Sequence, residues 1–135
     1  MSDFEYKKIE NGISVTKYTG EKTVIDIPNE IDGLPVISIG SKAFAENHHI
    51  TSITIPDSVT TIGKAALAYA FALESITIPD SVTSIGEAAF ACCKALKNIT
   101  LSQKLTSVES NTFTGCHELT EITIPESVTS IKKCI

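Results

Sequence analysis

Apolar and polar residues recur along this chain with a fixed period, which equals the spacing from Ser52 to Ser75. The string SITIPDSVTTIG begins at Ser52, and SITIPDSVTSIG begins one period later at Ser75. EITIPESVTSI begins at Glu121, two periods further on, and NITLSQKLTSVE at Asn98 fills the intervening position. A fixed period of this length is typical of a solenoid, in which each repeat forms one coil of a stack.

Six apolar columns stay in phase when the copies are aligned at this period. One copy alone buries too few apolar side chains to offset the conformational entropy lost when the whole copy is ordered. We therefore expect equivalent residues to pack against each other from coil to coil. The columns are Ile53, Ile76, Ile99 and Ile122; Ile55, Ile78, Leu101 and Ile124; Val36, Val59, Val82, Leu105 and Val128; Ile39, Ile62, Ile85, Val108 and Ile131; Phe44, Leu67, Phe90 and Phe113; and Ile50, Leu73, Leu96 and Leu119.

Each copy is predicted to contain a strand, a turn, a second short strand and a short helix. Ile53 and Ile55 alternate with polar residues, which is typical of a half-buried strand, and the following proline ends it. Residues 59–62 indicate a second extended piece that ends at a glycine. The Ala-rich stretches KAALAYAFALE, from Lys64, and EAAFACCKAL, from Glu87, predict short helices.

Residues 1–23 are predicted to form an N-terminal β-hairpin cap, and residues 24–135 a solenoid of about four to five coils, each one period long. The dipeptide Asn11-Gly12 lies between two alternating segments, which is a strong hairpin signal. The side chains expected to cover the first coil are Phe4, Tyr6, Ile13 and Val15.

The repeat is irregular at both of its ends. The first copy, VIDIP, begins at Val24 and precedes the next by more than one period, because its segment PNEIDGLPV carries five extra residues with Asp-Gly and Pro turn chemistry. We expect a bulging loop there. The last copy reads SIKKCI and stops part-way, from which we expect a truncated C-terminus or an end that pairs with another molecule through Val128, Ile131 and Ile135.

These columns resemble the BspA-type class of leucine-rich repeats. The resemblance covers residues 24–131, and departures from the class pattern are Leu67 for Phe, Asn47 and Ala70 for Cys, and Ser102 for Pro. The copy that matches every named position of the pattern contains Leu73, Ile76, Ile78, Pro79, Val82, Ile85, Gly86, Ala89, Phe90 and Cys93.

The resemblance implies an α/β repeat fold. It implies a right-handed, curved leucine-rich-repeat solenoid with a parallel β-sheet and short helices or turns on the convex side. It also implies a bacterial surface or secreted protein, often an adhesin that binds a host or matrix protein. The class has no catalytic residues to carry over.

Composition narrows the classes of partner. Hydrophobic residues make up 42% of the chain and charged residues 20%, as in a globular protein, and the net charge is −5. An acidic chain is a poor ligand for nucleic acid or for an anionic membrane surface. No apolar run is long enough for a membrane helix, and the start, MSDFEYKKIENG, does not read as a signal peptide. The chain itself is therefore compatible with the cytoplasm, or with a mature piece of a secreted protein.

The cysteines leave two alternatives open. Cys93 and Cys116 share a column, so they are expected about one strand spacing apart, within reach of a disulfide. The alternative, which we favour, is two buried thiols that act as small hydrophobes, because the same column contains Ala70. Cys92 and Cys134 occupy other columns, so the four cysteines do not converge on a zinc ion.

The sequence offers no other catalytic or metal-ligating constellation. His48 and His117 share a column but lie three coils apart, roughly 14 Å, which is too far to hold one ion. Threonines recur as columns at the positions of Thr54 and Thr60, which favours structural ladders over a single activated nucleophile. No cofactor and no metal is predicted, and an enzyme is disfavoured.

The favoured function is a non-catalytic protein-binding scaffold that uses the curved face of its sheet. The alternative is a structural spacer or self-assembly module that pairs through its C-terminal coil. By strand alternation, the residues predicted to form the binding face are Ser52, Thr54, Ser75, Thr77, Asn98, Thr100, Glu121 and Thr123.

Overall fold

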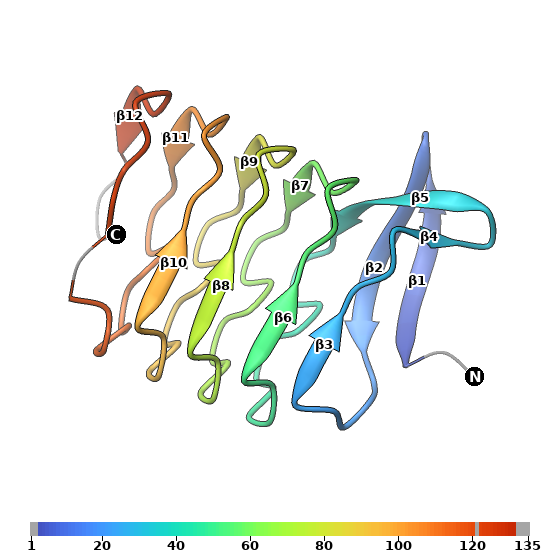
Figure 1. Ribbon diagram of the computed structural model, residues 1–135, viewed down its shortest axis with the longest axis horizontal. Coiled ribbons are helices and arrows are strands. Elements are labelled where there is room, and N and C mark those ends of the chain that lie inside the picture. Colours follow the sequence, from blue (N-terminus) through green and yellow to red (C-terminus); the bar gives the residue numbers. More distant parts are fainter. Residues whose placement is uncertain (1–2, 121, 132–135) are drawn as a thin grey trace.

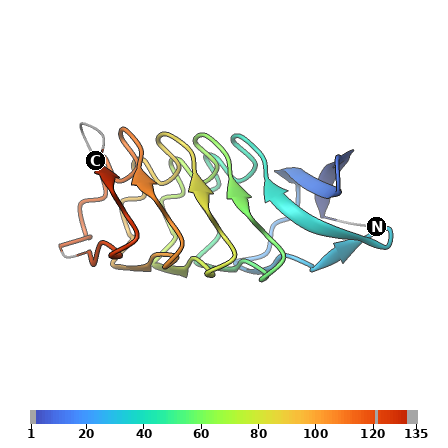
Figure 2. The same ribbon diagram turned by 90° about the horizontal axis from the view of Figure 1, so that it is seen from above.

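The chain folds into a parallel β-sheet solenoid of about five coils. The computed structural model describes residues 3–120 and 122–131, and it contains no helix among them. Figures 1 and 2 show the coils side by side in sequence order, with an N-terminal β-hairpin at one end of the stack. The predicted solenoid with a parallel sheet is therefore confirmed.

Four three-residue strands form a parallel sheet, which we call the front sheet. Equivalent residues of successive copies are register partners in it, for example Ile25 with Ile53, and Ile76 with Ile99. Equivalent positions of successive repeats therefore lie next to each other on adjacent strands. The strands, in spatial order, are β3 (Val24–Asp26), β6 (Ser52–Thr54), β8 (Ser75–Thr77) and β10 (Asn98–Thr100).

A second set of strands lies behind the front sheet and forms the rear sheet. The predicted second extended piece at residues 59–62 is a strand over its last two residues. The rear sheet contains β1 (Phe4–Ile9), β2 (Gly12–Tyr18), β5 (Leu34–Ile39), β7 (Thr61–Ile62) and β9 (Ser84–Ile85), with β4 (Glu30–Ile31) paired to β5. Two further parallel strands, β11 (Ser107–Val108) and β12 (Ser130–Ile131), form a separate pair.

The apolar columns line the space between the sheets. Leu67 and Phe90 are fully buried, and the rings of Phe90 and Phe113 stack at 5.9 Å between centroids and 6° between planes. Ile99 and Ile122 are only partly buried, although their equivalents in earlier coils are buried. Burial therefore declines along the stack toward its last described coil.

The short helices predicted from Lys64 and from Glu87 are wrong, because both stretches form successive turns. Their alternate N–H groups donate to the next coil, as from Leu67 N to the Ala89 carbonyl at 2.8 Å. An α-helix would instead use these groups within its own segment. Hydrogen bonds between coils therefore replace the local ones that the composition favours.

These turns need left-handed backbone conformations at intervals. Ala65 has a φ of 55° and Tyr69 a φ of 63°, and the next coil repeats this at Ala88 and Cys92. Such conformations cost about 1–2 kcal/mol per residue. The bonds to the next coil, which satisfy alternate N–H groups, offset this cost.

The N-terminal hairpin joins the stack directly. β1 and β2 are antiparallel, and the two residues between them are Glu10 and Asn11, so the turn begins one residue earlier than the Asn-Gly signal. Asn11 has the positive φ (73°) that such turns require. Ile13 and Val15 are fully buried, because β2 also pairs in parallel with β5. Whether the hairpin acts as a cap stays a prediction.

The five extra residues of the first copy form a second hairpin rather than an irregular bulge. β4 pairs antiparallel with the start of β5, and Asp32 and Gly33 between them have φ values of 54° and 77°. The Tyr6 hydroxyl donates to the Asp32 carboxylate at 2.5 Å and links the two hairpins. This hydrogen bond raises the pKa of Tyr6.

Ser102 shows how the stack accommodates a departure from the repeat. It replaces the proline of the other copies and is fully buried. Its hydroxyl donates to the Val82 carbonyl at 2.6 Å and accepts from Lys104 N at 3.1 Å. The serine therefore ties its own turn to the preceding coil.

The coils approach each other closely at Gly63 and Gly86. A Cβ on Gly86 would lie 2.5 Å from Lys64 N and 2.7 Å from the Gly63 carbonyl carbon. The Gly86 N–H also donates to the Ile62 carbonyl at 2.8 Å. The coil spacing at this corner thus leaves no room for a side chain.

We predict that Gly86→Ala lowers the free energy of unfolding by about 1–3 kcal/mol, because the methyl group forces the two coils apart. Urea unfolding followed by circular dichroism measures it. Ser84→Ala, at an exposed site on β9, is the control and should change stability by less than about 0.5 kcal/mol. Equal stability of Gly86→Ala and the wild type would contradict close coil contact here.

Candidate binding surface

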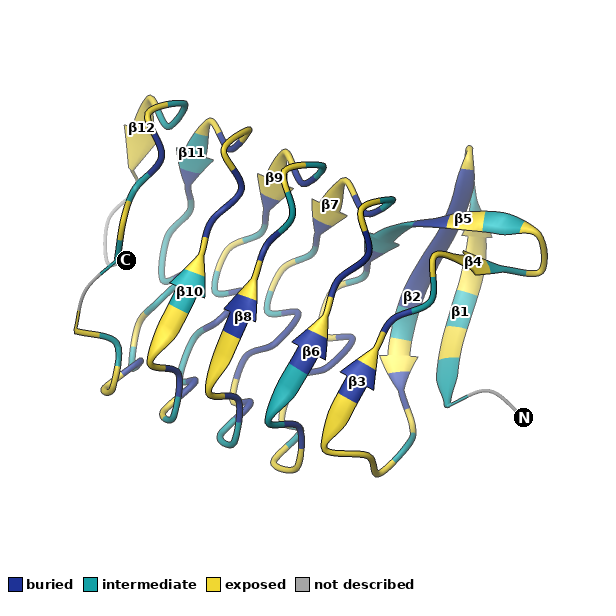
Figure 3. Cartoon of the chain, in the orientation of Figure 1, coloured by how far each residue is buried: buried dark blue, intermediate teal, exposed yellow. Residues whose placement is uncertain are grey.

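The outer face of the front sheet consists of two rows of small polar side chains. Strand alternation points the isoleucines inward and leaves the residues on either side of them facing out. In Figure 3 the centres of β3, β6 and β8 are coloured as buried and the centre of β10 as half-buried, while the ends of these strands are coloured as exposed or half-buried. One row contains Ser52, Ser75 and Asn98, and the other contains Thr54, Thr77 and Thr100.

The structure thus brings together six of the eight residues predicted for the binding face. Five of the six are exposed, and Ser52 is half-buried. Thr123 is exposed but does not lie in a strand. Glu121 lies outside the described residues.

Two further residues extend the rows and were missed by the sequence analysis. On β3, Val24 is the register partner of Ser52, and Asp26 is the partner of Thr54. Both are exposed, Val24 to 60%. The alternation of the copy VIDIP does predict that both residues face outward. The extra residues after this copy, however, put it out of phase with the columns of the later copies.

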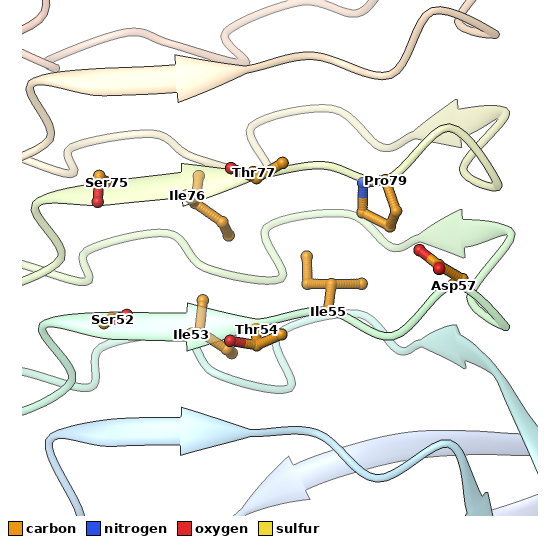
Figure 4. A pocket seen from close by; sticks show the side chains of 9 residues that line it. All are labelled: Ser52, Ile53, Thr54, Ile55, Asp57, Ser75, Ile76, Thr77 and Pro79. Atoms are coloured by element: carbon orange, nitrogen blue, oxygen red, sulfur yellow. The ribbon is translucent and has the colours of Figure 1, made fainter.

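A shallow depression of about 430 Å³ lies between β6 and β8 on this face. Figure 4 shows hydroxyl side chains on both strands and the isoleucines between them. Asp57 is the only residue with a charged side chain in its lining. The lining residues are Ser52, Ile53, Thr54, Ile55, Asp57, Ser75, Ile76, Thr77 and Pro79.

The depression coincides with a gap in the backbone ladder. β6 and β8 are in register only at Ser52 and Ser75, whereas β6 with β3 and β8 with β10 each match over three residue pairs. The N–H of Ile78 donates to the Thr100 carbonyl at 2.8 Å, but within the described part of the chain Ile55 makes no equivalent bond to Thr77. The sheet therefore opens at the carboxyl ends of β6 and β8.

This surface offers hydrogen bonding rather than acid–base chemistry. Its hydroxyl groups both donate and accept, and the opened ladder adds a backbone N–H and a carbonyl. Among residues 3–120 and 122–131, no group of three or more His, Cys, Asp or Glu side chains is arranged to hold a metal ion. The geometry suits contact with another polar surface.

The second threonine column has a structural role. The hydroxyl of Thr83 donates to the Thr60 carbonyl at 3.4 Å, and that of Thr129 donates to the Thr106 carbonyl at 3.3 Å. The backbone N–H groups of both residues bond to the same carbonyls. These threonines reinforce contacts between coils, as predicted for a ladder.

The histidines do not converge. His48 and His117 are exposed, and the ring of His48 stacks on Phe71 at 4.4 Å between centroids. Lys94 Nζ lies 4.7 Å from the centroid of the same Phe71 ring. The sequence analysis missed this stack, although the three residues share one column.

Comparison with known proteins identifies the repeat. Residues 13–135 match the BspA type leucine rich repeat region, in six copies. The chain belongs to this family. BspA-type repeats are scaffolds of the protein-interaction kind, in which stacked coils present an extended surface. No curated protein matches this BspA-type chain.

Solved structures share this BspA-type fold. A leucine-rich repeat protein from T. pallidum is 31% identical, with a TM-score of 0.92 over 96% of this chain and 61% of that one. A leucine-rich repeat protein from Bacteroides capillosus is 26% identical, with a TM-score of 0.66 over 97% of this chain and 94% of that one. The pneumococcal vaccine antigen PcpA, at 22% identity and a TM-score of 0.59 over 97% of this chain and 45% of that one, shows the same fold.

This chain spans only part of the T. pallidum protein, 61% of its length. Within the described residues, no helix is long and apolar enough to cross a membrane.

We predict that the amide of Ile55 exchanges with solvent about fivefold faster than that of Ile78, its equivalent one coil later. The reason is the hydrogen bond that only Ile78 makes to the next strand, and one such bond is worth about 1 kcal/mol. Hydrogen exchange followed by NMR measures both amides in one sample. Equal protection would show that the ladder between β6 and β8 is closed.

Proposed function

We propose that this chain is a non-catalytic protein-binding scaffold whose binding face is the outer face of the front sheet. The observation that carries the proposal is the pair of polar rows on β6, β8 and β10, in which every residue but the half-buried Ser52 is exposed. The row of Ser52, Ser75 and Asn98 is in register across all three strands. Rows of this kind suit an extended partner surface better than a small substrate, because they do not converge on a point.

The opened ladder between β6 and β8 supports a defined centre for this face. The depression there is lined by hydroxyl groups and has isoleucine side chains at its base. A partner side chain that enters it would meet hydrogen-bonding groups at the rim and apolar contact below. Interfaces commonly concentrate their binding energy at central positions that lose their water when the partner binds.

We also propose a bacterial cell-surface or secreted location and an adhesin-type role toward a host or matrix protein. The support is membership of the BspA-type family. The face has four short strands, so we expect modest affinity from this chain alone. Further coils in a longer protein would raise it through avidity.

The N-terminal hairpin is proposed to act as the cap of the stack. Phe4 and Tyr6 on β1 pack against the core as partly buried residues, and Ile13 and Val15 on β2 are fully buried. Without this cover, the apolar side of the first coil would face water.

A second candidate is self-assembly through the last described coil. Ile131 on β12 is 52% exposed, and Val128 is only partly buried, so this coil presents apolar surface. Ile135, which was expected to contribute, lies outside the described residues. Pairing of two such coils would bury this surface.

The binding face is tested with the double variant Thr77→Arg, Thr100→Arg against a panel of immobilised, purified extracellular matrix proteins. We expect the affinity for any protein that binds the wild type to fall by at least about tenfold, because two long charged side chains cover the polar rows. Surface plasmon resonance measures the affinity.

The matched control carries the same substitution on the rear sheet, at exposed positions of β7 and β9: Thr61→Arg with Ser84→Arg. It should bind like the wild type. If the two double variants bind equally well and remain folded, the front face is not the binding site. If the wild type binds none of the panel, the adhesin role toward matrix proteins is rejected.

Self-assembly predicts that the light-scattering mass of the wild type rises with concentration, whereas Ile131→Lys stays monomeric because the lysine places a charge in the apolar contact. Val24→Lys, at a more exposed apolar site on β3, serves as the control and should behave like the wild type. A wild type that is monomeric at every concentration eliminates this second function.

A further inference from the structure

Two cysteines occupy the same position in adjacent coils inside the stack. Cys93 is fully buried and Cys116 is 8% exposed, and both thiols are free. Earlier coils carry Asn47 and Ala70 at this position. Among the described residues, the pair is therefore confined to one junction between coils.

The register around the two cysteines is tight. Just before them, Phe90 N donates to the Thr112 carbonyl at 3.1 Å and Cys92 N donates to the Thr114 carbonyl at 2.6 Å. A backbone ladder of this kind separates equivalent Cα atoms by about 5 Å. Disulfides span Cα distances of roughly 4.4–6.8 Å, a range that includes the spacing of such a ladder.

The two sulfur atoms also point the same way. Cys93 Sγ donates to the Leu67 carbonyl at 3.1 Å, and Cys116 Sγ makes the equivalent bond to the Phe90 carbonyl at 3.1 Å. The neighbouring Cys116 side chain raises the pKa of Cys93, and burial raises it further. The Cys93 side chain in turn lowers the pKa of Cys116.

Cys92 does not compete for either position. It belongs to the column of Tyr69 and Gly115 and is half-buried. A Cβ on Gly115 would lie 3.0 Å from Cys92 Sγ. The residue next to Cys92 in the following coil is therefore a glycine, which has no thiol for Cys92 to pair with.

We propose that Cys93 and Cys116 form an intercoil disulfide by exchange with a small-molecule disulfide, such as oxidised glutathione. Cys116 is the entry point, because it is the more exposed of the two. Its thiolate attacks one sulfur of the small-molecule disulfide, which breaks that S–S bond and releases one thiolate. Cys93, deprotonated by the released base, then attacks the Cys116 sulfur of the mixed disulfide and releases the second thiolate.

In the overall exchange, two protein thiols lose two protons and two electrons and gain one S–S bond, and the small-molecule disulfide becomes two thiols. The new bond closes a covalent loop around a single coil. A loop of this size restricts the unfolded chain, which raises the thermal midpoint. The proposal does not depend on the binding face of the front sheet.

The test uses the full chain with Cys92→Ser and Cys134→Ser, so that only the proposed pair remains; Cys134 lies outside the described residues. The protein is incubated with oxidised glutathione, then denatured and titrated for thiols. We expect both thiols to disappear and the intact mass to fall by two hydrogen atoms without a glutathione adduct. The thermal midpoint should rise by about 10 °C, and dithiothreitol should reverse the change.

The control adds Cys93→Ala, which copies the residue that the stack already accommodates at Ala70. This variant should show neither the mass loss nor the rise of the midpoint on oxidation. Two titratable thiols after denaturation, a glutathione adduct as the final product, or a disulfide-linked dimer on a non-reducing gel would each overturn the proposal.

Discussion

The structure depends on hydrogen bonds between equivalent backbone groups of successive coils. Strands of the front sheet, the corner glycines Gly63 and Gly86, and alternate turn residues donate their N–H groups to the next or the preceding coil. A described coil therefore depends on its neighbours for much of its backbone hydrogen bonding. The same dependence explains why Phe90 and Phe113 stack almost parallel, since the backbone ladder beside them fixes one ring above the other.

The columns made most of this architecture predictable from sequence. Ile53 and Ile76 are inward and buried, as their period requires, and Thr54 and Thr77 are outward. The stretch from Lys64 was misassigned because local composition favours a helix, whereas the stack uses alternate N–H groups between coils. A single-sequence pattern does not reveal which partner an N–H group will choose.

The candidate binding face was likewise predictable in part from the sequence. Its six central residues follow from alternation alone, but Val24 and Asp26 depend on an insertion whose length hides their phase. The opening between β6 and β8 has no sequence signal, because the two copies read almost identically there. It is a property of how two coils meet, and it gives an otherwise repetitive surface one distinct position.

The β4–β5 hairpin shows how this fold tolerates added length. The first copy carries five more residues than the others, yet Val36 and Ile39 remain fully buried in their columns and β5 still pairs with β7. The surplus leaves the stack as a projecting arm, so the coils behind it keep their phase. Loops of new sequence could therefore diversify at this corner while the scaffold beneath stays unchanged, much as variable loops do on an antibody framework.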